Sequence, residues 1–354
     1  MFHLYSLVYF YILNILYSKE YSFMDSISQF VLGASVGYLL AGKDRGKKAI
    51  FIGGLAATLP DLDTFFIKPF EYDDLTMLIH HRGFTHSLLF AVLAPILCAW
   101  GSRSWFKSLT FKGLYWWYFW VFLTHSLLDC FTSWGTQFFW PHPYKVAFNA
   151  IFIIDPLYTL PLMIGLLGYK RPGWVKKGVI ISCMYLLLCV GMKGYMYHRI
   201  KQSIQVQSIP AIRFTYRPTP FNCLLWSTTI ESKHHFFFST YSIFDSKSFS
   251  PMFAVPKQHH LLPYEQMPSR LKSLIYVTKE YYSLEKTASK MIVRDLRFGL
   301  FGDPLRYGPI HIFSHEIQRP ISESSRIIMK RSEVPNMGQH FKELFFRMFP
   351  FIKK

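Results

Sequence analysis

The sequence predicts a mainly α-helical membrane protein, in which a polytopic helical bundle is followed by a small α+β domain. Three observations support this fold class. Of the 354 residues, 51% are hydrophobic and only 17% are charged, whereas ordinary soluble domains carry about 25% charged residues. Six apolar runs lie within the first 192 residues. After them the chain changes to short segments rich in β-branched and aromatic residues.

Residues 1–23 form an uncertain N-terminal extension. The stretch from Phe2 to Tyr17 is apolar and aromatic, but it lacks the basic region and the small-residue cleavage site of a signal peptide. Met24 opens a segment that reads like a natural start. These residues are therefore either a working segment or an over-called beginning.

Residues 24–192 are predicted to form a membrane-embedded helical domain that carries a metal site. Several of its apolar runs are shorter than the ~20 residues that a full span needs, so we expect some to be tilted or supported by neighbours. Gly33 and Gly37 form a G-x-x-x-G pair, a pattern that permits close helix contact. The apolar runs are 27–41, 49–67, 85–100, 113–130, 151–168 and 178–192.

Basic residues are concentrated in alternate loops of this domain. The loops at 43–48, 103–112 and 170–177 hold 11 of the 15 basic residues before position 193, whereas the opposite loops hold most of the acidic residues. The positive-inside rule places the three basic loops in the cytoplasm. We therefore expect a multi-pass protein of the cell membrane, with its acidic motifs and its C-terminal domain on the outer side.

Residues 205–300 are predicted to form the small α+β domain. Ser283–Phe298 reads as a helix with basic residues, and residues 301–354 form a basic segment of unclear order. Other parts are rich in β-branched and aromatic residues between turn signals, as strands are. These expected strands lie at Ala211–Tyr216, Leu224–Ile230 and His235–Phe244.

The net charge of the chain is concentrated in this second part. Residues 193–354 hold 24 basic and 11 acidic residues, which accounts for +13 of the total of +18. A basic domain tethered to a membrane most simply faces anionic lipid head groups. Nucleic acid is not an expected partner, because no recognised binding motif is present.

Four short polar motifs fall at the expected outward ends of the apolar runs. Ionisable groups beside membrane helices are costly unless they are paired or bound, so one shared cause is more economical than four. His125 and Asp129 are four residues apart and share a helix face. Imidazoles and carboxylates without thiolates suit zinc, and also Mn or Fe. Taken separately, each motif could be a helix cap, a turn or a buried pair. The motifs are PDLD at 60–63, HHRGFTHS at 80–87, HSLLD at 125–129 and DP at 155–156.

These motifs, in this order, carry a family resemblance. MDSISQFVLGASVGYLLAGK, PDLD, HRGFTHSLLF, FLTHSLLDCFTSWGTQ and NAIFIIDPLYTLP resemble the membrane-bound metal-dependent hydrolases of the YdjM/DUF457 type. RPTPFNCLLW, YSIFD and RDLRFG look like the longer members with an appended C-terminal domain, so the resemblance covers about 24–300. The pattern is also distantly similar to zinc-dependent phospholipase C and nuclease folds. The metal ligands that the resemblance implies are Asp61, Asp63, His81, His86, His125 and Asp129.

The resemblance implies metal-assisted hydrolysis of a lipid or phosphoester, with zinc as the first choice of metal. Asp63 or Asp155 could then act as general base, and Arg82 could hold a phosphate oxygen. The alternatives are that Arg82 pairs with a nearby acid, and that Asp155 caps a helix with Pro156 at its first position. Hydroxyl groups that could orient ligands, or merely cap helices, belong to Thr85, Thr124 and Thr132.

A non-catalytic membrane protein is the second hypothesis, with a structural metal or an ion-binding His/Asp cluster. A transporter more often places polar groups near the middle of the membrane, whereas these lie at helix ends. The expected partners are membrane lipids and a lipid or small-molecule substrate; neither the substrate nor the oligomeric state can be inferred. The histidines at 234–235 and 259–260 read as surface or loop residues, because neighbours on a strand point to opposite faces.

Overall fold

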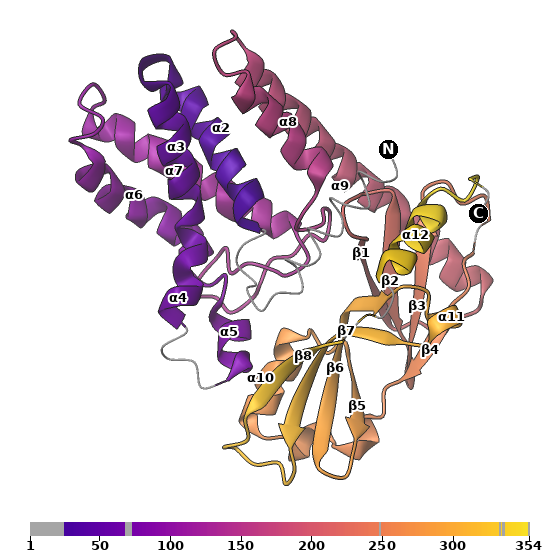
Figure 1. Cartoon of the computed structure of the whole chain (residues 1–354). Helices are drawn as coiled ribbons and strands as arrows, with labels where there is room; N and C mark the ends of the chain where they lie inside the picture. The colour runs from indigo at the N-terminus through magenta and orange to yellow at the C-terminus, as the bar shows by residue number, and fades with distance from the viewer. Residues whose placement is uncertain (1–24, 68–72, 248, 333, 335–336, 353–354) are drawn as a thin grey trace. The chain divides into compact units, whose positions relative to one another are not determined.

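The computed structural model of the chain is half helix, with its strands confined to the part after residue 212 (Figure 1). It describes residues 25–67, 73–247, 249–332, 334 and 337–352, so the extension at 1–23 lies outside the described residues. The chain divides into two compact units, which we call the helical unit and the sheet unit. The helical unit comprises Met1–Pro69, His80–Gly191 and Pro220–Asn222, and the sheet unit comprises Phe70–Ile79, Met192–Thr219 and Cys223–Lys354.

The helical unit begins with two antiparallel helices, α2 (Asp25–Arg45) and α3 (Lys47–Thr58). Small residues let these helices approach closely. A Cβ atom added at Gly33 would lie 2.2 Å from the Cβ of Ala57, and one at Gly37 would lie 2.8 Å from the carbonyl oxygen of Ala49. The G-x-x-x-G pair therefore makes the close contact that its pattern predicts.

Helix caps set the positions of the next two helices. α6 (Leu88–Ser102) begins after Ser87, whose hydroxyl accepts a hydrogen bond from the Phe90 N–H. α7 (Phe111–Phe131) begins after Thr110, which caps the Gly113 N–H in the same way. Each cap satisfies a backbone donor that the first helical turn leaves free. Short elements precede α6, namely η1 (Pro60–Leu62), α4 (Asp63–Ile67) and η3 (Phe84–His86).

Aromatic side chains of α7 fill the core of this unit against alanines of α3 and α6. The Trp117 indole N–H donates to the Gly37 carbonyl oxygen at 2.9 Å, which ties α7 to α2. Two further helices, α8 (Pro156–Leu167) and α9 (Trp174–Val206), complete the set. α8 packs against α2 in a second apolar cluster around Tyr158 and Leu162.

Two helical segments of the described chain are long and apolar enough to cross a membrane, Lys47–Ile67 and Trp174–Val206. A third exists if Asp74–His86 and Leu88–Ser102, which are bent by 61°, are counted as one span. The apolar helices Ile27–Gly42 and Pro156–Leu167 are shorter than a full span. By length and composition, two or three of the six apolar runs lie in segments that could cross a membrane.

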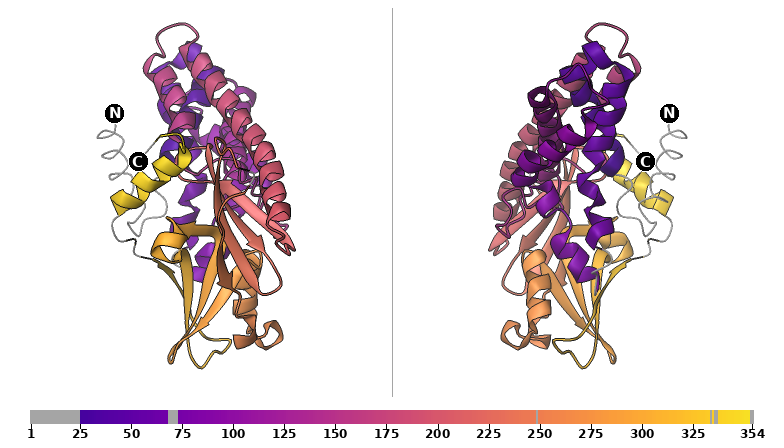
Figure 2. Two further views of the ribbon diagram at one scale, coloured as in Figure 1. Left: turned by 90° about the vertical axis from the view of Figure 1, so that its right-hand side faces the viewer. Right: turned by 90° about the vertical axis from the view of Figure 1, so that its left-hand side faces the viewer.

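The sheet unit consists mainly of two four-stranded antiparallel sheets, which can be followed in Figure 2. The strands expected at 211–216, 224–230 and 235–244 are confirmed as β1, β2 and β3. The Thr229 hydroxyl donates to the Leu296 carbonyl oxygen at 3.1 Å and so links the two sheets. The first sheet has the order β1 (Arg213–Pro218), β2 (Leu225–Glu231), β3 (His235–Ser242) and β4 (Phe253–Pro256), and the second has the order β5 (Tyr282–Lys286), β6 (Lys290–Phe301), β7 (Ile310–Gln318) and β8 (Ile327–Arg331).

The expected helix at Ser283–Phe298 is wrong, because this segment forms β5 and β6. Met291, Val293 and Asp295 are buried while the residues between them are more exposed, which is the period of a strand. The sheet continues past residue 300 with β7 and β8. The other helices of this unit include α10 (Ser269–Val277), α11 (Pro304–Tyr307) and α12 (Met337–Met348).

The edge of the second sheet is covered by acidic residues from far earlier in the chain. They lie at the start of α5 (Asp74–His80), a helix that belongs to the sheet unit. Asp73 accepts a hydrogen bond from the Ile327 N–H at 2.9 Å, and Asp74 accepts one from the Met329 N–H at 2.6 Å. These carboxylates occupy two backbone donors of β8, which would otherwise offer an open pairing edge.

Replacing Gly33 with alanine should destabilise the helical unit, because the new Cβ would meet Ala57 and Gly53 at 2.2 and 2.6 Å. We expect a loss of ~1–3 kcal/mol in unfolding free energy, measured as a lower unfolding temperature of the purified protein in detergent. Gly101→Ala is the matched control, since a Cβ added there would meet no neighbouring atom of the described chain within 4 Å. An unchanged unfolding temperature for Gly33→Ala would contradict the close packing of α2 and α3.

Candidate metal centre

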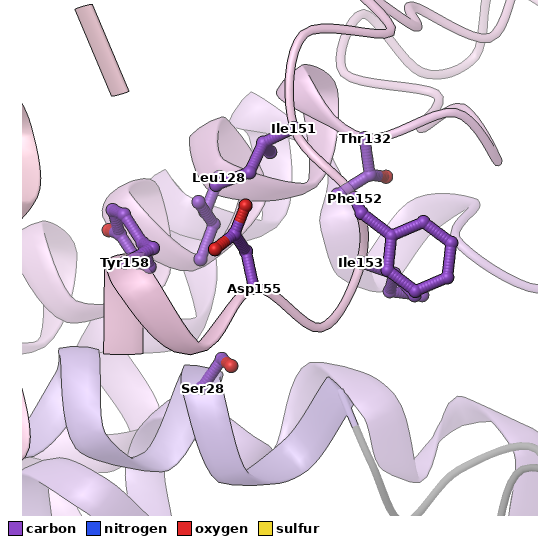
Figure 3. A pocket seen from close by; sticks show the side chains of 8 residues that line it. All are labelled: Ser28, Leu128, Thr132, Ile151, Phe152, Ile153, Asp155 and Tyr158. Atoms are coloured by element: carbon purple, nitrogen blue, oxygen red, sulfur yellow. The ribbon is translucent and has the colours of Figure 1, made fainter. Parts of the chain in front are cut away.

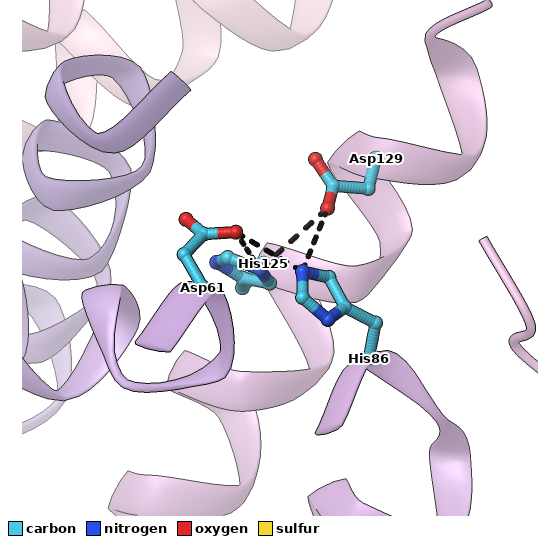
Figure 4. Close-up of side chains that lie close together, drawn as sticks. All are labelled: Asp61, His86, His125 and Asp129. Atoms are coloured by element: carbon cyan, nitrogen blue, oxygen red, sulfur yellow. Dashed lines mark hydrogen bonds and ion pairs between the residues drawn. The ribbon is translucent and has the colours of Figure 1, made fainter. Parts of the chain in front are cut away.

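Four buried ionisable side chains converge where helical segments begin or end (Figure 4). Asp61 lies in η1, directly after α3, and His86 is the last residue of η3, just before α6. His125 and Asp129 lie near the C-terminal end of α7, one turn apart on the same face. One ligand atom from each of the four lies within 4.8 Å of the others.

Imidazoles and carboxylates face each other within this group. The His86 Nε2 atom lies 3.1 Å from Asp61 Oδ1 and 3.4 Å from Asp129 Oδ2. The His125 Nε2 atom lies 3.8 Å from Asp61 Oδ1 and 3.6 Å from Asp129 Oδ2. The four ligand atoms therefore surround one common point, with a carboxylate on either side of each imidazole.

Several polar atoms of the group have no hydrogen-bond partner among the described residues. They are the Oδ2 atoms of Asp61 and Asp129 and both ring nitrogens of His125. A buried polar atom that lacks a partner costs about 1–3 kcal/mol, and more when it is charged. Buried charges in proteins are paired or coordinate metals, and this donor set suits zinc, Mn or Fe. The group could therefore hold a metal ion.

Gln29, which is not among the residues predicted from the sequence, supports the group from α2. Its buried Nε2 donates to Asp129 Oδ1 at 2.8 Å and to the His125 carbonyl oxygen at 3.3 Å. These bonds leave Asp129 Oδ2 directed at the two imidazoles. The available signal was a polar amide inside the apolar run 27–41, but this pattern alone does not say which helix the amide meets.

Asp63 and His81, which the sequence analysis also proposed as ligands, lie beside the group of four and bind each other. The His81 Nδ1 atom is 2.9 Å from Asp63 Oδ1. Asp63 Oδ2 accepts hydrogen bonds from the Arg82 N–H at 3.0 Å and from the Thr85 hydroxyl at 3.2 Å. The same hydroxyl is 3.0 Å from His86 Nδ1. Asp63 thus connects His81, through the Thr85 hydroxyl, to the Nδ1 side of the His86 ring.

Arg82 is buried and pairs with an acid, which is one of the two roles that the sequence left open. Its Nη2 atom lies 3.4 Å from Asp129 Oδ1, and its Nη1 atom donates to the Thr132 hydroxyl at 3.1 Å. Thr132 in turn donates to the Asp129 carbonyl oxygen at 2.8 Å. The φ angle of Arg82 is +59°, a conformation that costs a residue other than glycine ~1–3 kcal/mol. By contrast, among the described residues Thr124 bonds only to carbonyl groups of its own helix.

Asp155 is separate from the group of four and caps α8. One of its oxygens accepts a hydrogen bond from the Leu157 N–H at 3.0 Å, and the other accepts from the Tyr185 hydroxyl at 2.8 Å. It lines a cavity of ≈ 10 Å³ together with Thr132 (Figure 3), which is about the room that one water needs. Burial raises the pKa of Asp155 to about 6.

The paired histidines of the sheet unit gather around a shallow pocket instead of a metal group. His234 and His235 are exposed, whereas His259 is half-buried and stacks on the Tyr282 ring with 4.1 Å between centroids. Among the described residues, these histidines form no group of converging ligand atoms. The pocket has a volume of ≈ 310 Å³ and is lined by residues 233–235 and 256–260.

Comparison with known proteins identifies the family. The profile described as YdjM inner membrane protein matches residues 24–200, which is half of the chain. The chain belongs to the YdjM inner membrane protein family. The region matched to the YdjM family contains all four residues of the candidate centre and ends within α9, so most of the sheet unit lies beyond it.

Two curated proteins are similar to parts of this YdjM family member. The chain is 36% identical over 116 residues to the inner membrane protein YbcI of Escherichia coli (strain K12), which covers 31% of this chain and 62% of YbcI. It is 24% identical over 196 residues to the uncharacterized protein YfhP of Bacillus subtilis (strain 168), which covers 52% of this chain and 56% of YfhP. The chain thus spans less than two thirds of either relative. No solved structure matches it.

Family membership and apolar helices together establish a membrane protein. The resemblance read from the sequence is therefore confirmed. The matching profile and YbcI are both described as inner membrane proteins, and the buried Asp/His group is a feature of this chain that could hold a metal ion.

Replacing Gln29 with methionine should destabilise the helical unit, because Asp129 Oδ1 would lose its 2.8 Å hydrogen bond while staying buried. Losing a hydrogen bond to a charged group costs about 1.5–3 kcal/mol. Thermal unfolding in detergent measures the effect. Gln205→Met on the exposed end of α9 is the control and should leave stability within about 0.5 kcal/mol of wild type. Equal unfolding temperatures for the two variants would show that Gln29 does not support the group.

Proposed function

We propose that this YdjM family member is a membrane-bound hydrolase whose divalent metal, zinc as the first choice, is held by Asp61, His86, His125 and Asp129. The observation that carries the proposal is that His125 Nε2 and Asp129 Oδ2, which face each other at 3.6 Å, have no hydrogen-bond partner among the described residues. A bound cation would supply the missing partner for these atoms. It would also compensate the charge of the two buried carboxylates.

The chain's own residues supply the geometry that such a metal needs. A divalent metal held there would act as a Lewis acid on a carbonyl or phosphoryl oxygen. It would also lower the pKa of water enough to supply a nucleophile near neutral pH. Thr85 lies within hydrogen-bond distance of His86 Nδ1, so the Nε2 atom is directed to the centre. Gln29 and Arg82 hold Asp129 Oδ1 from the other side. Such outer contacts fix the orientation of metal ligands.

Asp63 is the proposed general base, and Asp155 is the second candidate. Asp63 and His81 form a hydrogen-bonded pair directly behind His86, and the His81 side chain remains 18% exposed. A proton taken up by this pair can therefore pass to solvent. The pKa of Asp155, which burial raises to about 6, lies near the pH at which a base is most useful.

The proposed substrate is a lipid or another phosphoester that reaches the site from the membrane surface. The four ligands are buried, but they lie where helical segments begin or end, which favours access from the membrane surface over the midplane site of a transporter. Exposed apolar side chains of α4, the short helix that follows Asp61, such as Phe65 and Phe66, favour a substrate with acyl chains. Arg82 remains in the proposed catalytic set as the residue that holds Asp129 in position.

The test compares metal content and hydrolysis in the same variants. Asp61→Asn and His125→Ala should lose most of the bound metal, measured by elemental analysis of the purified protein, together with its hydrolytic activity. Asp63→Asn leaves all four ligands in place and should keep most of the metal, but it should lose activity by ~100-fold or more, because the proposed base is removed. Activity is measured on a panel of phosphomonoesters, phosphodiesters and fluorescent phospholipids.

His80→Ala is the matched control, since this neighbouring histidine is exposed and outside the group of four. His234→Ala and His259→Ala in the sheet unit should also stay close to wild type. Full metal content in the Asp61 and His125 variants would reject the site. Metal loss in these variants, with no hydrolysis of any substrate by wild type, would favour a structural metal or ion-binding role.

We also propose that the helical unit is a polytopic bundle with its basic loops in the cytoplasm. The loops at 43–48, 103–112 and 170–177 hold most of the basic residues before position 193, and this bias sets orientation. Single cysteines placed in each loop of a cysteine-free variant should resist an impermeant thiol reagent added to intact cells. Labelling of all three positions from outside would invert the topology and move the proposed site to the cytoplasmic side.

A further inference from the structure

Helix α9 is longer than a membrane is thick. Its 33 residues, Trp174–Val206, extend about 50 Å at 1.5 Å per residue, whereas the hydrocarbon core measures ~30 Å. Lys193 lies about 24 Å along the axis from Lys177, close to the level where hydrocarbon gives way to head groups. The exposed side chains of Tyr195 and Tyr197 follow it, and tyrosine is enriched at this level.

Strand β1 of the sheet unit packs against this part of α9. The Tyr197 ring stacks on the Phe214 ring with 5.5 Å between centroids. The Lys193 ammonium group lies over the Tyr216 ring, 4.7 Å from its centroid. β1 is therefore held next to the segment of α9 whose distance along the helix from Lys177 corresponds to head-group level.

Four basic side chains gather around the end of β1. The guanidinium carbons of Arg217 and Arg297 lie 5.2 and 5.0 Å from the centroid of the same Phe298 ring. Burial and the nearby positive charge of Arg297 lower the pKa of Lys279 to about 8. Burial also lowers the pKa of Arg217 to about 9. We call this set the basic cluster, and its members are Lys193, Arg217, Lys279 and Arg297.

The acidic residues near the basic cluster are already engaged by other cations. Asp295 makes a two-pronged ion pair with Arg297, with contacts of 2.7 and 3.1 Å. Glu231 pairs with Arg213 and Lys257. Glu280 also pairs with Arg213, at 3.3 Å. Arg217 therefore makes no ion pair among the described residues, and Asp295, whose negative charge acts on Arg217, is already paired with Arg297.

Arg217 is the most clearly unsatisfied member of the basic cluster. Its side chain is buried, with 8% exposure, and its Nε atom has no hydrogen-bond partner among the described residues. Buried charges in proteins are normally paired, because removing an unpaired charge from water is expensive. Lys193 and Lys279 are only half-buried, so an anion can reach the basic cluster from the surface.

We propose that the basic cluster binds a phosphate group, which an anionic phospholipid supplies at the membrane surface. The planar guanidinium of Arg217 can donate two parallel hydrogen bonds to phosphate oxygens. The ammonium groups of Lys193 and Lys279 add charge without fixed geometry. This site lies in the sheet unit, uses no residue of the candidate metal centre, and does not depend on the proposed hydrolysis.

The test measures lipid retention and thermal shifts on the full chain purified in a neutral detergent. Native mass spectrometry should show that wild type retains dioleoylphosphatidylglycerol in preference to dioleoylphosphatidylcholine. Arg217→Gln should reduce this retention by about tenfold or more, because a charge-assisted contact is lost. Dioleoylphosphatidylglycerol should raise the unfolding temperature of wild type but not of Arg217→Gln, since only bound ligand stabilises the folded state.

Arg294→Gln is the matched control, since it removes one positive charge from β6 at an ion pair with Glu285 outside the basic cluster. It should bind lipid like wild type. If Arg217→Gln does not fold, Lys279→Gln tests the same site from its more exposed side. Binding of inorganic phosphate that depends on Arg217, without preference for the anionic lipid, would support the site and assign it to free phosphate. Equal binding of both probes by wild type and the variants would overturn the proposal.

Discussion

The helical unit is organised by the need to satisfy four ionisable side chains that have been removed from water. Asp61, His86, His125 and Asp129 come from three separate segments, and each is almost completely buried. Their ligand atoms can meet only if α3 ends beside α7 and α6 begins at the same place. The glycines of α2 and α3 permit the close approach that this arrangement uses.

Around these four residues, the supporting contacts are divided between the two kinds of ligand. The imidazole of His86 is oriented through Thr85 and Asp63, whereas the carboxylate of Asp129 is held by Gln29 and Arg82. In the first set, Asp63 belongs to α4 and Thr85 to η3, whereas in the second set Gln29 belongs to α2 and Arg82 to the turn between α5 and η3. A change in either set would alter the direction of a ligand without removing it.

Sequence spacing predicts contacts within an element better than contacts between elements. His125 and Asp129 could be placed on one face because the helical period fixes their relation. Their meeting with Asp61 and His86 was expected because the motifs all carry ionisable residues and fall on the same predicted side of the membrane. Sequence spacing alone, however, could not show that these four residues form the group while Asp63 and His81 lie beside it. Nor could it find Gln29, because its role depends on how α2 packs against α7.

The spacing of charged residues explains why Ser283–Phe298 was predicted as a helix although it forms β5 and β6. Along β5 and β6, opposite charges pair across strands, as in the contact between Arg294 and Glu285 and that between Lys290 and Glu316. In a single sequence, charges separated by a few apolar residues also fit the exposed face of a helix. Only the partner strand β7, which begins at Ile310, distinguishes the two. The first three strands were predictable because their β-branched and aromatic residues are dense enough to indicate a strand alone.

Because Asp73 and Asp74 bind the edge of β8, the sheet unit includes a segment that lies far from the rest of it in sequence. The hydrogen bond from Ile327 to Asp73 joins residues that are 254 positions apart, so the sheet edge is completed only when almost the whole chain has been synthesised. During synthesis, Asp73 is made long before Ile327. Bringing the two together closes a very large loop, and the entropic cost of closing it slows this step of folding. A fragment excised from residue 193 onward would lack both carboxylates, and its bare edge would be free to recruit a strand from another copy. The boundary suggested by the change in composition is thus not a boundary at which the chain can be cut.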